Sequence, residues 1–372
     1  MKNTYLLLIV LLLCSCSQPE EKITTYHSNG NTHLSFTRNS NGYVGVFTEY
    51  YENDTIKKQY NFIGDQKINT GTWTTYYNKD WNKVESPSEF YRIINFDDSG
   101  KPKGKVIDYF QKTGTKQMEG SFFSIEPDVE EGEFIQYTEN GEISEVYNYK
   151  NGALNGPYKY YYENGKLETE INYKNGVKNG PYKYYYENGK LETEINYKNG
   201  VKNGPFKNYY ENGKLKTEEN YKNGKVNGPF KNYYKNGKLE TETTFKNGVK
   251  NGPYKIYYKN GKLELEANHK NNKETGLWKY YYKNGKLKQE INYKNGKMNG
   301  LSKSYDENEK LKQEGDYKND KETGLWKSYY KNGKLEGEFT FKNGKLNGPA
   351  KFYYKNGKFE GEATFKNGKI IN

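Results

Sequence analysis

The sequence predicts an all-β chain, an elongated single-layer antiparallel meander of β-hairpins that are each 24 residues long. Two observations predict it. The stretch GPYKYYYENGKLETEINYKNGVKN fills 156–179 and then fills 180–203 again without a change. Within that stretch, two runs rich in aromatic and branched residues flank Asn-Gly, the strongest short signal for a hairpin. A fixed period of this length is typical of repeat architectures.

A glycine opens each repeat unit, and we number positions within a unit from it. These glycines are Gly132, Gly156, Gly180, Gly204, Gly228, Gly252, Gly276, Gly300, Gly324 and Gly348. Residues before 132 contain degenerate copies at irregular spacing, and SIEPDVEE (124–131) is the clearest irregular joint. We therefore expect a signal peptide (1–15), a tether (16–25), degenerate repeats (26–131) and regular repeats (132–372).

The composition favours ordered strands over disorder. Mean hydropathy is −1.21 and only 32% of residues are hydrophobic, but the chain has 41 tyrosines. Disordered chains are poor in aromatic residues. Tyrosine suits a half-buried strand, where its ring packs and its hydroxyl stays hydrated.

The hairpin turn predicts the register and the two faces of the sheet. We expect a type I′ turn at Asn188-Gly189, with position 7 opposite 12, 6 opposite 13, 4 opposite 15 and 3 opposite 16. The segment KNGVKNGP is expected to form a longer loop, with proline outside the ladder. Alternation then puts positions 3, 5, 7, 12, 14, 16 and 18, which are Tyr, Leu, Thr and Ile in 180–203, on face A, and mainly Lys and Glu on face B.

Face B is expected to carry two ladders. Position 4 is Lys and position 15 is Glu in every unit from 156 onward, and position 6 is always Tyr. A row of carboxylates could serve metal or acid–base chemistry, but such chemistry needs a singular environment. Identical Lys–Glu neighbours repeated along the chain instead indicate a structural ladder. Its first members are Lys159, Glu170, Lys183, Glu194, Tyr161 and Tyr185.

The N-terminus indicates export. Lys2 precedes an apolar run from Tyr5 to Leu13, too short to span a bilayer and suited to a signal peptide. The stretch Leu13-Cys14-Ser15-Cys16 resembles a bacterial lipobox, and small Ser15 favours Cys16 over Cys14 as the lipid-bearing residue. Such a lipid anchors the protein to a membrane. A signal cleaved elsewhere, with a soluble product, is the alternative.

Charge and motifs disfavour nucleic-acid binding and catalysis. The net charge of +12 is spread over the units, and arginine occurs only at 38 and 92. The three histidines are scattered, and the motifs of hydrolases, P-loop enzymes and zinc proteases are absent from the sequence. We therefore expect no enzyme activity, no catalytic residues, no cofactor and no metal.

The pattern G-P-[YF]-K-x-Y-Y-x-N-G-K-L-x-x-E-x-x-[YF]-K-N-G resembles the bacterial variant of the MORN repeat, in proteins often labelled YwqK-type antitoxins. The resemblance covers nearly all of 26–372. It implies single-layered twisted sheets of hairpins that serve as scaffolds for protein contacts, and it transfers no catalytic residue. The chain departs from the pattern at Asn308-Glu309, Asn271-Asn272 and Asn319-Asp320.

These observations predict an envelope-anchored, non-enzymatic scaffold that binds protein or glycan partners, at the outer membrane or cell surface. The alternative is an antitoxin or immunity-type protein that sheaths a toxin, although an exported protein would not meet a cytoplasmic toxin. Strand 359–365 is expected to be an open edge that allows self-association. Position 5 varies between invariant neighbours, so we expect partner contacts at Tyr160, Tyr184, Asn208, Asn232, Ile256, Tyr280, Ser304, Ser328 and Phe352.

Overall fold

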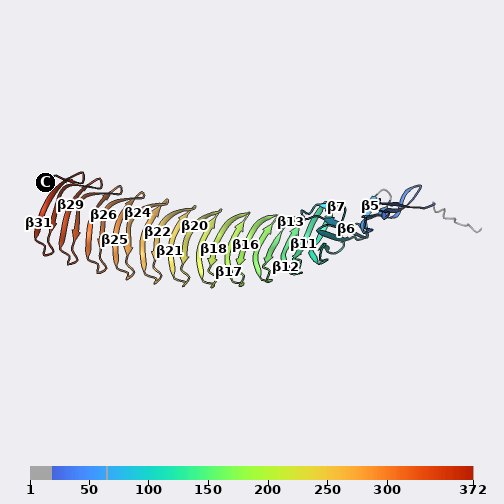
Figure 1. Ribbon diagram of the computed structural model, residues 1–372, viewed down its shortest axis with the longest axis horizontal. Coiled ribbons are helices and arrows are strands. Elements are labelled where there is room, and N and C mark those ends of the chain that lie inside the picture. Colours follow the sequence, from blue (N-terminus) through green and yellow to red (C-terminus); the bar gives the residue numbers. More distant parts are fainter. Residues whose placement is uncertain (1–18, 64–65, 372) are drawn as a thin grey trace, which may run out of the picture. The chain divides into compact units, whose positions relative to one another are not determined.

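The chain is all-β, as predicted. The computed structural model describes residues 19–63 and 66–371, and within these ranges it contains strands and no helix (Figure 1). The predicted signal peptide and Cys16 lie outside the described residues. In the described part, no helix is long and apolar enough to cross a membrane. The chain divides into two compact units, 1–165 and 166–372.

The first unit contains two antiparallel sheet regions. Strands β1 to β5 pair in sequence order, and β6 begins a second series in which β6 pairs with β8, β8 with β9 and β9 with β10. Strand β1 starts at Glu21, within the segment that the sequence analysis assigned to a tether. The strands are β1 (Glu21–Tyr26), β2 (Thr32–Asn39), β3 (Gly42–Tyr50), β4 (Ile56–Ile63), β5 (Gln66–Asn69), β6 (Thr72–Tyr77), β7 (Lys83–Val84), β8 (Phe90–Asn95), β9 (Val106–Phe110), β10 (Lys116–Ile125), β11 (Asp128–Tyr137), β12 (Ile143–Lys150), β13 (Ala153–Leu154) and β14 (Gly156–Tyr161).

The first unit has its own hydrophobic core. Trp73 is 1% exposed and donates its indole N–H to the carbonyls of Gln59 and Thr70. Around it pack Tyr60, Ile94, Phe96, Val106, Met118, Phe122, Ile125, Phe134 and Tyr147. Because the cluster includes residues from β4, from β6 and from β8 to β12, it joins the two sheet regions of this unit.

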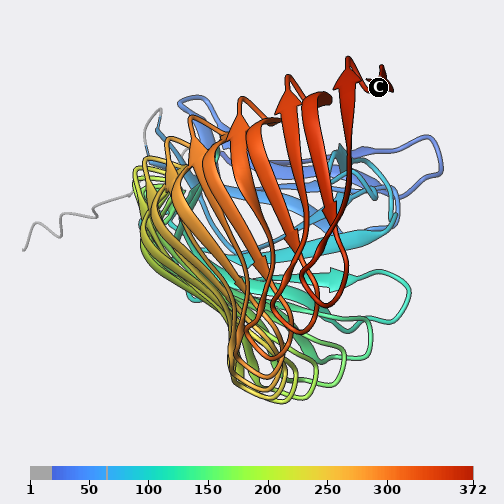
Figure 2. The ribbon, with the colours of Figure 1, turned by 90° about the vertical axis from the view of Figure 1, so that its left-hand side faces the viewer.

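The second unit is an open antiparallel meander in which each strand pairs with its neighbours in sequence. In Figure 2 its hairpins lie one behind another, with their turns along two edges. The strands are β15 (Leu167–Lys174), β16 (Val177–Tyr185), β17 (Leu191–Lys198), β18 (Val201–Tyr209), β19 (Leu215–Lys222), β20 (Lys225–Tyr233), β21 (Leu239–Lys246), β22 (Val249–Tyr257), β23 (Leu263–Lys270), β24 (Lys273–Tyr281), β25 (Leu287–Lys294), β26 (Lys297–Tyr305), β27 (Leu311–Lys318), β28 (Lys321–Tyr329), β29 (Leu335–Lys342), β30 (Lys345–Tyr353), β31 (Phe359–Lys366) and β32 (Lys369–Ile370).

The turn at Glu187–Lys190, which we call the ENGK turn, differs from the prediction. Gly189 donates its N–H to the carbonyl of Tyr186, and Tyr186 donates to that of Lys190. Only the glycine has positive φ, +86°. This is a type I turn followed by a glycine bulge rather than a type I′ turn. Position 6 therefore pairs with 12, as Tyr185 does with Leu191, and the predicted pairings 7–12 and 6–13 are wrong.

The tight type I′ turn lies at the other end of the hairpin, in the segment predicted to be a long loop. We call Lys198–Val201 the KNGV turn. Asn199 and Gly200 both have positive φ, 49° and 80°, and Lys198 pairs with Val201. The strand then runs through proline, since Pro181 pairs with Asn196. On the other side, the ladder with β15 is interrupted between Ile171 and Tyr173, so the missing proline N–H costs no ladder hydrogen bond there.

Burial separates the two faces as the alternation predicts for positions 3, 14, 16 and 18. Ile195 is 3% exposed and Ala267 1% exposed. Within the described part of the second unit, the buried side chains all lie at these four positions on face A: Thr169, Ile171, Ile195, Thr243, Leu265, Ala267, His269, Trp278, Ile291, Ser302, Trp326 and Ala350. A single layer thus shelters the centre of face A with its own side chains.

Candidate functional site

Face B carries a row of alternating charges along the second unit. Glu170 opposes Lys183, Lys183 opposes Glu194, and the same pairing continues from hairpin to hairpin. The ammonium of Lys231 lies 3.3 Å from a carboxylate oxygen of Glu218, with both side chains about a third exposed. Exposed pairs of this kind each contribute less than about 1 kcal/mol. The row therefore fixes the register of the strands and does not form a reactive centre.

Lys159 and Tyr161 belong to β14 in the first unit, where Lys159 opposes Val146. The ladder residues form no metal site: in the residues described, no cluster of three or more His, Cys, Asp or Glu is arranged to hold an ion.

The tyrosine at position 6 joins the same row. Its hydroxyl donates to the glutamate at position 15 of the preceding unit, at 2.8 Å for Tyr233 and Glu218. The pairs are Tyr209–Glu194, Tyr233–Glu218, Tyr257–Glu242, Tyr305–Glu290, Tyr329–Glu314 and Tyr353–Glu338. Partial burial, then the hydrogen bond and charge of the glutamate, raise the pKa of Tyr233, Tyr257 and Tyr329 to about 12.

These shifts predict the alkaline stability of the array. A group whose pKa is higher in the folded than in the unfolded protein favours folding until it ionises. The contribution should be complete below pH 10, the unfolded value, and lost between pH 10 and about 12. Thermal melts across this window, with tyrosinate absorbance followed in parallel, should show the loss. A variant with Phe at 233, 257 and 329 should lose less stability over the window; an unchanged profile would contradict the assignment.

A second tyrosine, at position 7, links a repeat to the following one in six places, and the sequence analysis did not foresee this. The hydroxyl of Tyr234 donates to the backbone carbonyl of Tyr257 at 2.6 Å. The same bond recurs for Tyr186, Tyr210, Tyr258, Tyr282 and Tyr330, each to the position 6 carbonyl of the following unit. The regular recurrence of Tyr at position 7 was the available signal.

The variable column at position 5 lies half-buried on face A. Each member opposes position 14 of both neighbouring strands; Asn208, for example, lies between Thr193 and Thr217. The amide of Asn208 donates to the hydroxyl of Thr193 at 2.8 Å, whereas Phe352 packs on Phe339 with ring centres 5.7 Å apart. The column is therefore a strip whose side chains differ in chemistry from repeat to repeat, on a surface that is otherwise regular.

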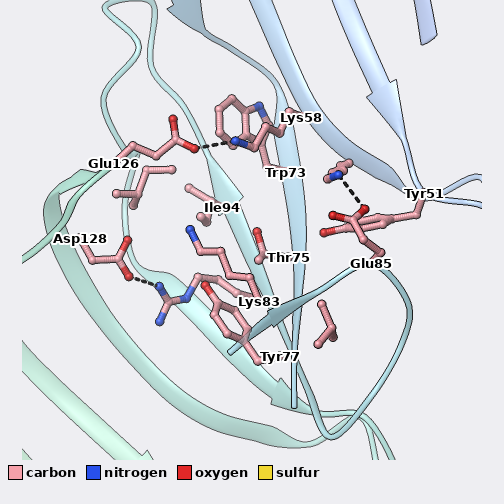
Figure 3. Close-up of a pocket in the computed structure, with 14 residues that line it drawn as sticks. Tyr51, Lys58, Trp73, Thr75, Tyr77, Lys83, Glu85, Ile94, Glu126 and Asp128 are labelled. Carbon is pink, nitrogen blue, oxygen red and sulfur yellow. Dashed lines mark hydrogen bonds and ion pairs between the residues drawn. The ribbon is translucent and has the colours of Figure 1, made fainter. Parts of the chain in front are cut away.

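The first compact unit contains a cavity of about 250 Å³ that is lined by charged, aromatic and aliphatic side chains (Figure 3). Lys58 pairs with Glu126 at 2.6 Å, and Lys57 pairs with Glu85 at 2.7 Å. Strands β4, β6, β7 and β8 line the cavity, together with the β10–β11 turn and residues at the ends of β3, β7 and β11. The residues labelled in Figure 3 are Tyr51, Lys58, Trp73, Thr75, Tyr77, Lys83, Glu85, Ile94, Glu126 and Asp128.

Arg92 also lines this cavity and is 6% exposed. Its Nε and Nη2 donate to both oxygens of Asp108, at 2.7 and 3.0 Å, and Nη1 donates to Asp128 at 2.8 Å. Burial raises the pKa of Asp108, against the hydrogen bonds and charge of Arg92. Burial lowers the pKa of Arg92, but Asp108 outweighs it and the net shift is upward. These charges are paired with one another, which is the arrangement of a structural ion-pair cluster.

The sequence analysis missed this cluster. Arg92 and Asp108 are 16 residues apart and Asp128 is 36 from Arg92, within units too degenerate for a register to be read. Two signals pointed there: Arg92 is one of only two arginines, and the irregular joint 124–131 supplies Glu126 and Asp128.

The hairpin geometry agrees with a comparison against family models. The model described as "MORN repeat variant" matches residues 43–63, 130–151, 154–175, 178–199, 202–223, 226–247, 250–271, 274–295, 298–319, 322–343 and 346–367. These ranges cover well over half of the chain. The chain belongs to the MORN repeat variant family. None of the matched ranges covers 64–129, which supply most of the cavity in the first unit of this MORN repeat protein.

Other comparisons show only weak similarity to this MORN repeat protein. No curated protein matches the chain. A chain in the crystal structure titled TcdB2-TccC3-Cdc42 is 11% identical with a TM-score of 0.17, over 93% of this chain and 18% of that one. A crystal structure of the eukaryotic initiation factor is 9% identical with a TM-score of 0.17, over 96% and 90% of the two chains. TM-scores at this level do not show a common fold.

Proposed function

We propose that this MORN repeat protein is a non-enzymatic scaffold whose hairpin array binds a protein or glycan partner through face A. The variable column at position 5 is the observation that carries the proposal. Positions 4 and 6 are constant and engaged in the face B ladder, while position 5 changes from Tyr to Asn, Ile, Ser and Phe at the middle of face A. Half-buried aromatic residues supply contact area at low entropic cost.

A photo-crosslinking residue tests the choice of face. Placed at Asn208, Ile256 or Ser304 on face A, it should capture the same partner from intact cells, whereas at Leu325 it should not. Leu325 is 49% exposed and lies at position 2 on face B, so accessibility does not favour face A. Equal capture from Leu325, or capture from no face A site, would contradict the proposal.

We further propose that the scaffold is held on a bacterial envelope membrane by a lipid on Cys16, at the outer membrane or cell surface. The support is the lipobox-like Leu13-Cys14-Ser15-Cys16 after a short apolar run. Metabolic labelling with an acyl-chain analogue should label the wild type and fail with Cys16→Ala. Protease treatment of intact cells should then degrade the array. Unlabelled wild-type protein recovered from the cytosol would refute anchoring without bearing on the crosslinking result.

The antitoxin alternative receives no support from the geometry or from the comparisons.

A further inference from the structure

Among the repeats that begin in the second compact unit, from Gly180 to Gly348, one lacks the position 7 tyrosine. In the unit beginning at Gly300, position 7 is Asp306. Its carboxylate accepts the backbone N–H groups of Asn308 and Lys310, both at 2.9 Å, and is thereby turned into its own ENGK turn. In the part of the chain that the structure describes, no side chain donates to the carbonyl of Tyr329, the counterpart of the carbonyls that other units' tyrosines bond.

The missing ring leaves a hollow of about 400 Å³. Tyr282 and Tyr330, the position 7 tyrosines of the flanking units, lie on either side of it, and Leu311 and Tyr329 also line it. Asp306 has no ring to fill this space. The hollow is therefore a vacancy in a periodic row of phenol rings.

The position of Lys312 is a second, independent indication that an aromatic ring fits in the hollow. At the same position 13, Lys216 lies over the ring of Tyr210 and Lys288 over that of Tyr282, each 5.8 Å from the ring centre. Lys312 lines the hollow and lies over no aromatic ring among the described residues. A cation placed above a ring face attracts an aromatic group in preference to a saturated one.

We propose that this hollow binds the phenol side chain of a tyrosine presented by a polypeptide partner. The hydroxyl would donate to the carbonyl of Tyr329, and the ring would lie under Lys312, as the protein's own tyrosines do in the units with Lys216 and Lys288. A carbonyl acceptor beside the ring site favours a ring that carries a hydrogen-bond donor, hence tyrosine over phenylalanine. The inference deepens the proposed scaffold function, on which it rests for its protein partner.

The test uses the full chain and N-acetyl-L-tyrosinamide as the probe, and saturation-transfer NMR follows binding of the probe to the hollow. We expect saturable binding at one site and at least several-fold weaker binding of N-acetyl-L-phenylalaninamide. Asp306→Tyr should abolish the site, because its own ring would fill the hollow. Equal binding of both probes, or binding unaffected by Asp306→Tyr, would overturn the proposal.

Tyr210→Asp is the matched variant, because it removes a ring that already has a lysine above it and exposes the carbonyl of Tyr233. It should create a second site and double the stoichiometry; a stoichiometry of one in the folded variant would overturn the proposal. The face A crosslinks at Asn208 and Ile256 are an independent readout. If these crosslinks capture a partner equally in wild type and Asp306→Tyr while the probe fails to bind, tyrosine binding in the hollow is refuted and the scaffold function stands.

Discussion

Replacing Arg92 by methionine is expected to destabilise the first unit by about 3–5 kcal/mol, because the carboxylate of Asp108 would be left buried without its partner. Asp108 is 0% exposed and receives two hydrogen bonds from Arg92. Hydrogen exchange followed by mass spectrometry should show the loss as faster exchange of β8, β9 and β10 amides, with the strands of the second unit unchanged.

Arg38→Met is the matched control, since Arg38 is the other arginine of the chain. Its pair with Glu21 is longer, at 3.3 Å, and the two side chains are 57% and 68% exposed. We expect a cost below about 1 kcal/mol there. The double variant Arg92→Met/Asp108→Leu should recover part of the loss, because it removes both buried charges. Equal effects of Arg92→Met and Arg38→Met would contradict the buried-cluster assignment.

Gly315→Ala is expected to destabilise the second unit by about 1–3 kcal/mol through overpacking. A Cβ at residue 315 would lie 2.1 Å from the indole ring of Trp326, which is 5% exposed and donates its N–H to the carbonyl of Asp316 at 3.2 Å. Denaturant unfolding followed by tryptophan fluorescence should report the shift, because the affected ring is itself a probe.

Gly361→Ala supplies the comparison for this change. A Cβ at residue 361 meets no atom within 4 Å, and neither glycine is among those with positive φ. We expect stability to be unchanged or raised by up to about 1 kcal/mol, because alanine restricts the unfolded chain. Pairing Gly315→Ala with Trp326→Phe should relieve some of the strain. A cost at Gly361 equal to that at Gly315 would show that the clash is not the cause.

The period, the strand class and the central pairing were predictable because they depend on residues that recur in phase. The pairing of Lys183 with Glu194 and of Tyr182 with Ile195 follows from a hairpin centred on the ENGK turn. The turn types were not predictable from Asn-Gly alone, since a typical repeat, such as 180–203, has Asn-Gly in both of its turns. The glycine bulge also removes strict alternation, which explains why Lys216 lies over Tyr210 although positions 13 and 7 were assigned to opposite faces.

The departures from the repeat pattern behave as their chemistry requires. Asn271 and Asn272, and Asn319 and Asp320, adopt positive φ in their KNGV turns, between 51° and 67°. Glu309 does the same in place of the ENGK glycine, at 67°. Asn and Asp adopt this left-handed backbone conformation more readily than other non-glycine residues. The conformation is therefore less favourable for Glu309, whose side chain is longer. The sequence marked the unit of Glu309 as irregular, but only the structure shows that Asp306 opens a hollow there.

The pairing of every strand with its sequence neighbours has a kinetic consequence. In the second unit, forming any ladder closes a loop of only a few residues, as at the ENGK and KNGV turns, however many hairpins the chain contains. Loop-closure entropy therefore does not rise with length, and folding can start at any hairpin and spread in both directions. Lengthening the gene by one exact duplication, of the kind visible in 156–179 and 180–203, should leave the folding rate nearly constant. Array length can thus change over generations without a folding barrier that selects against it.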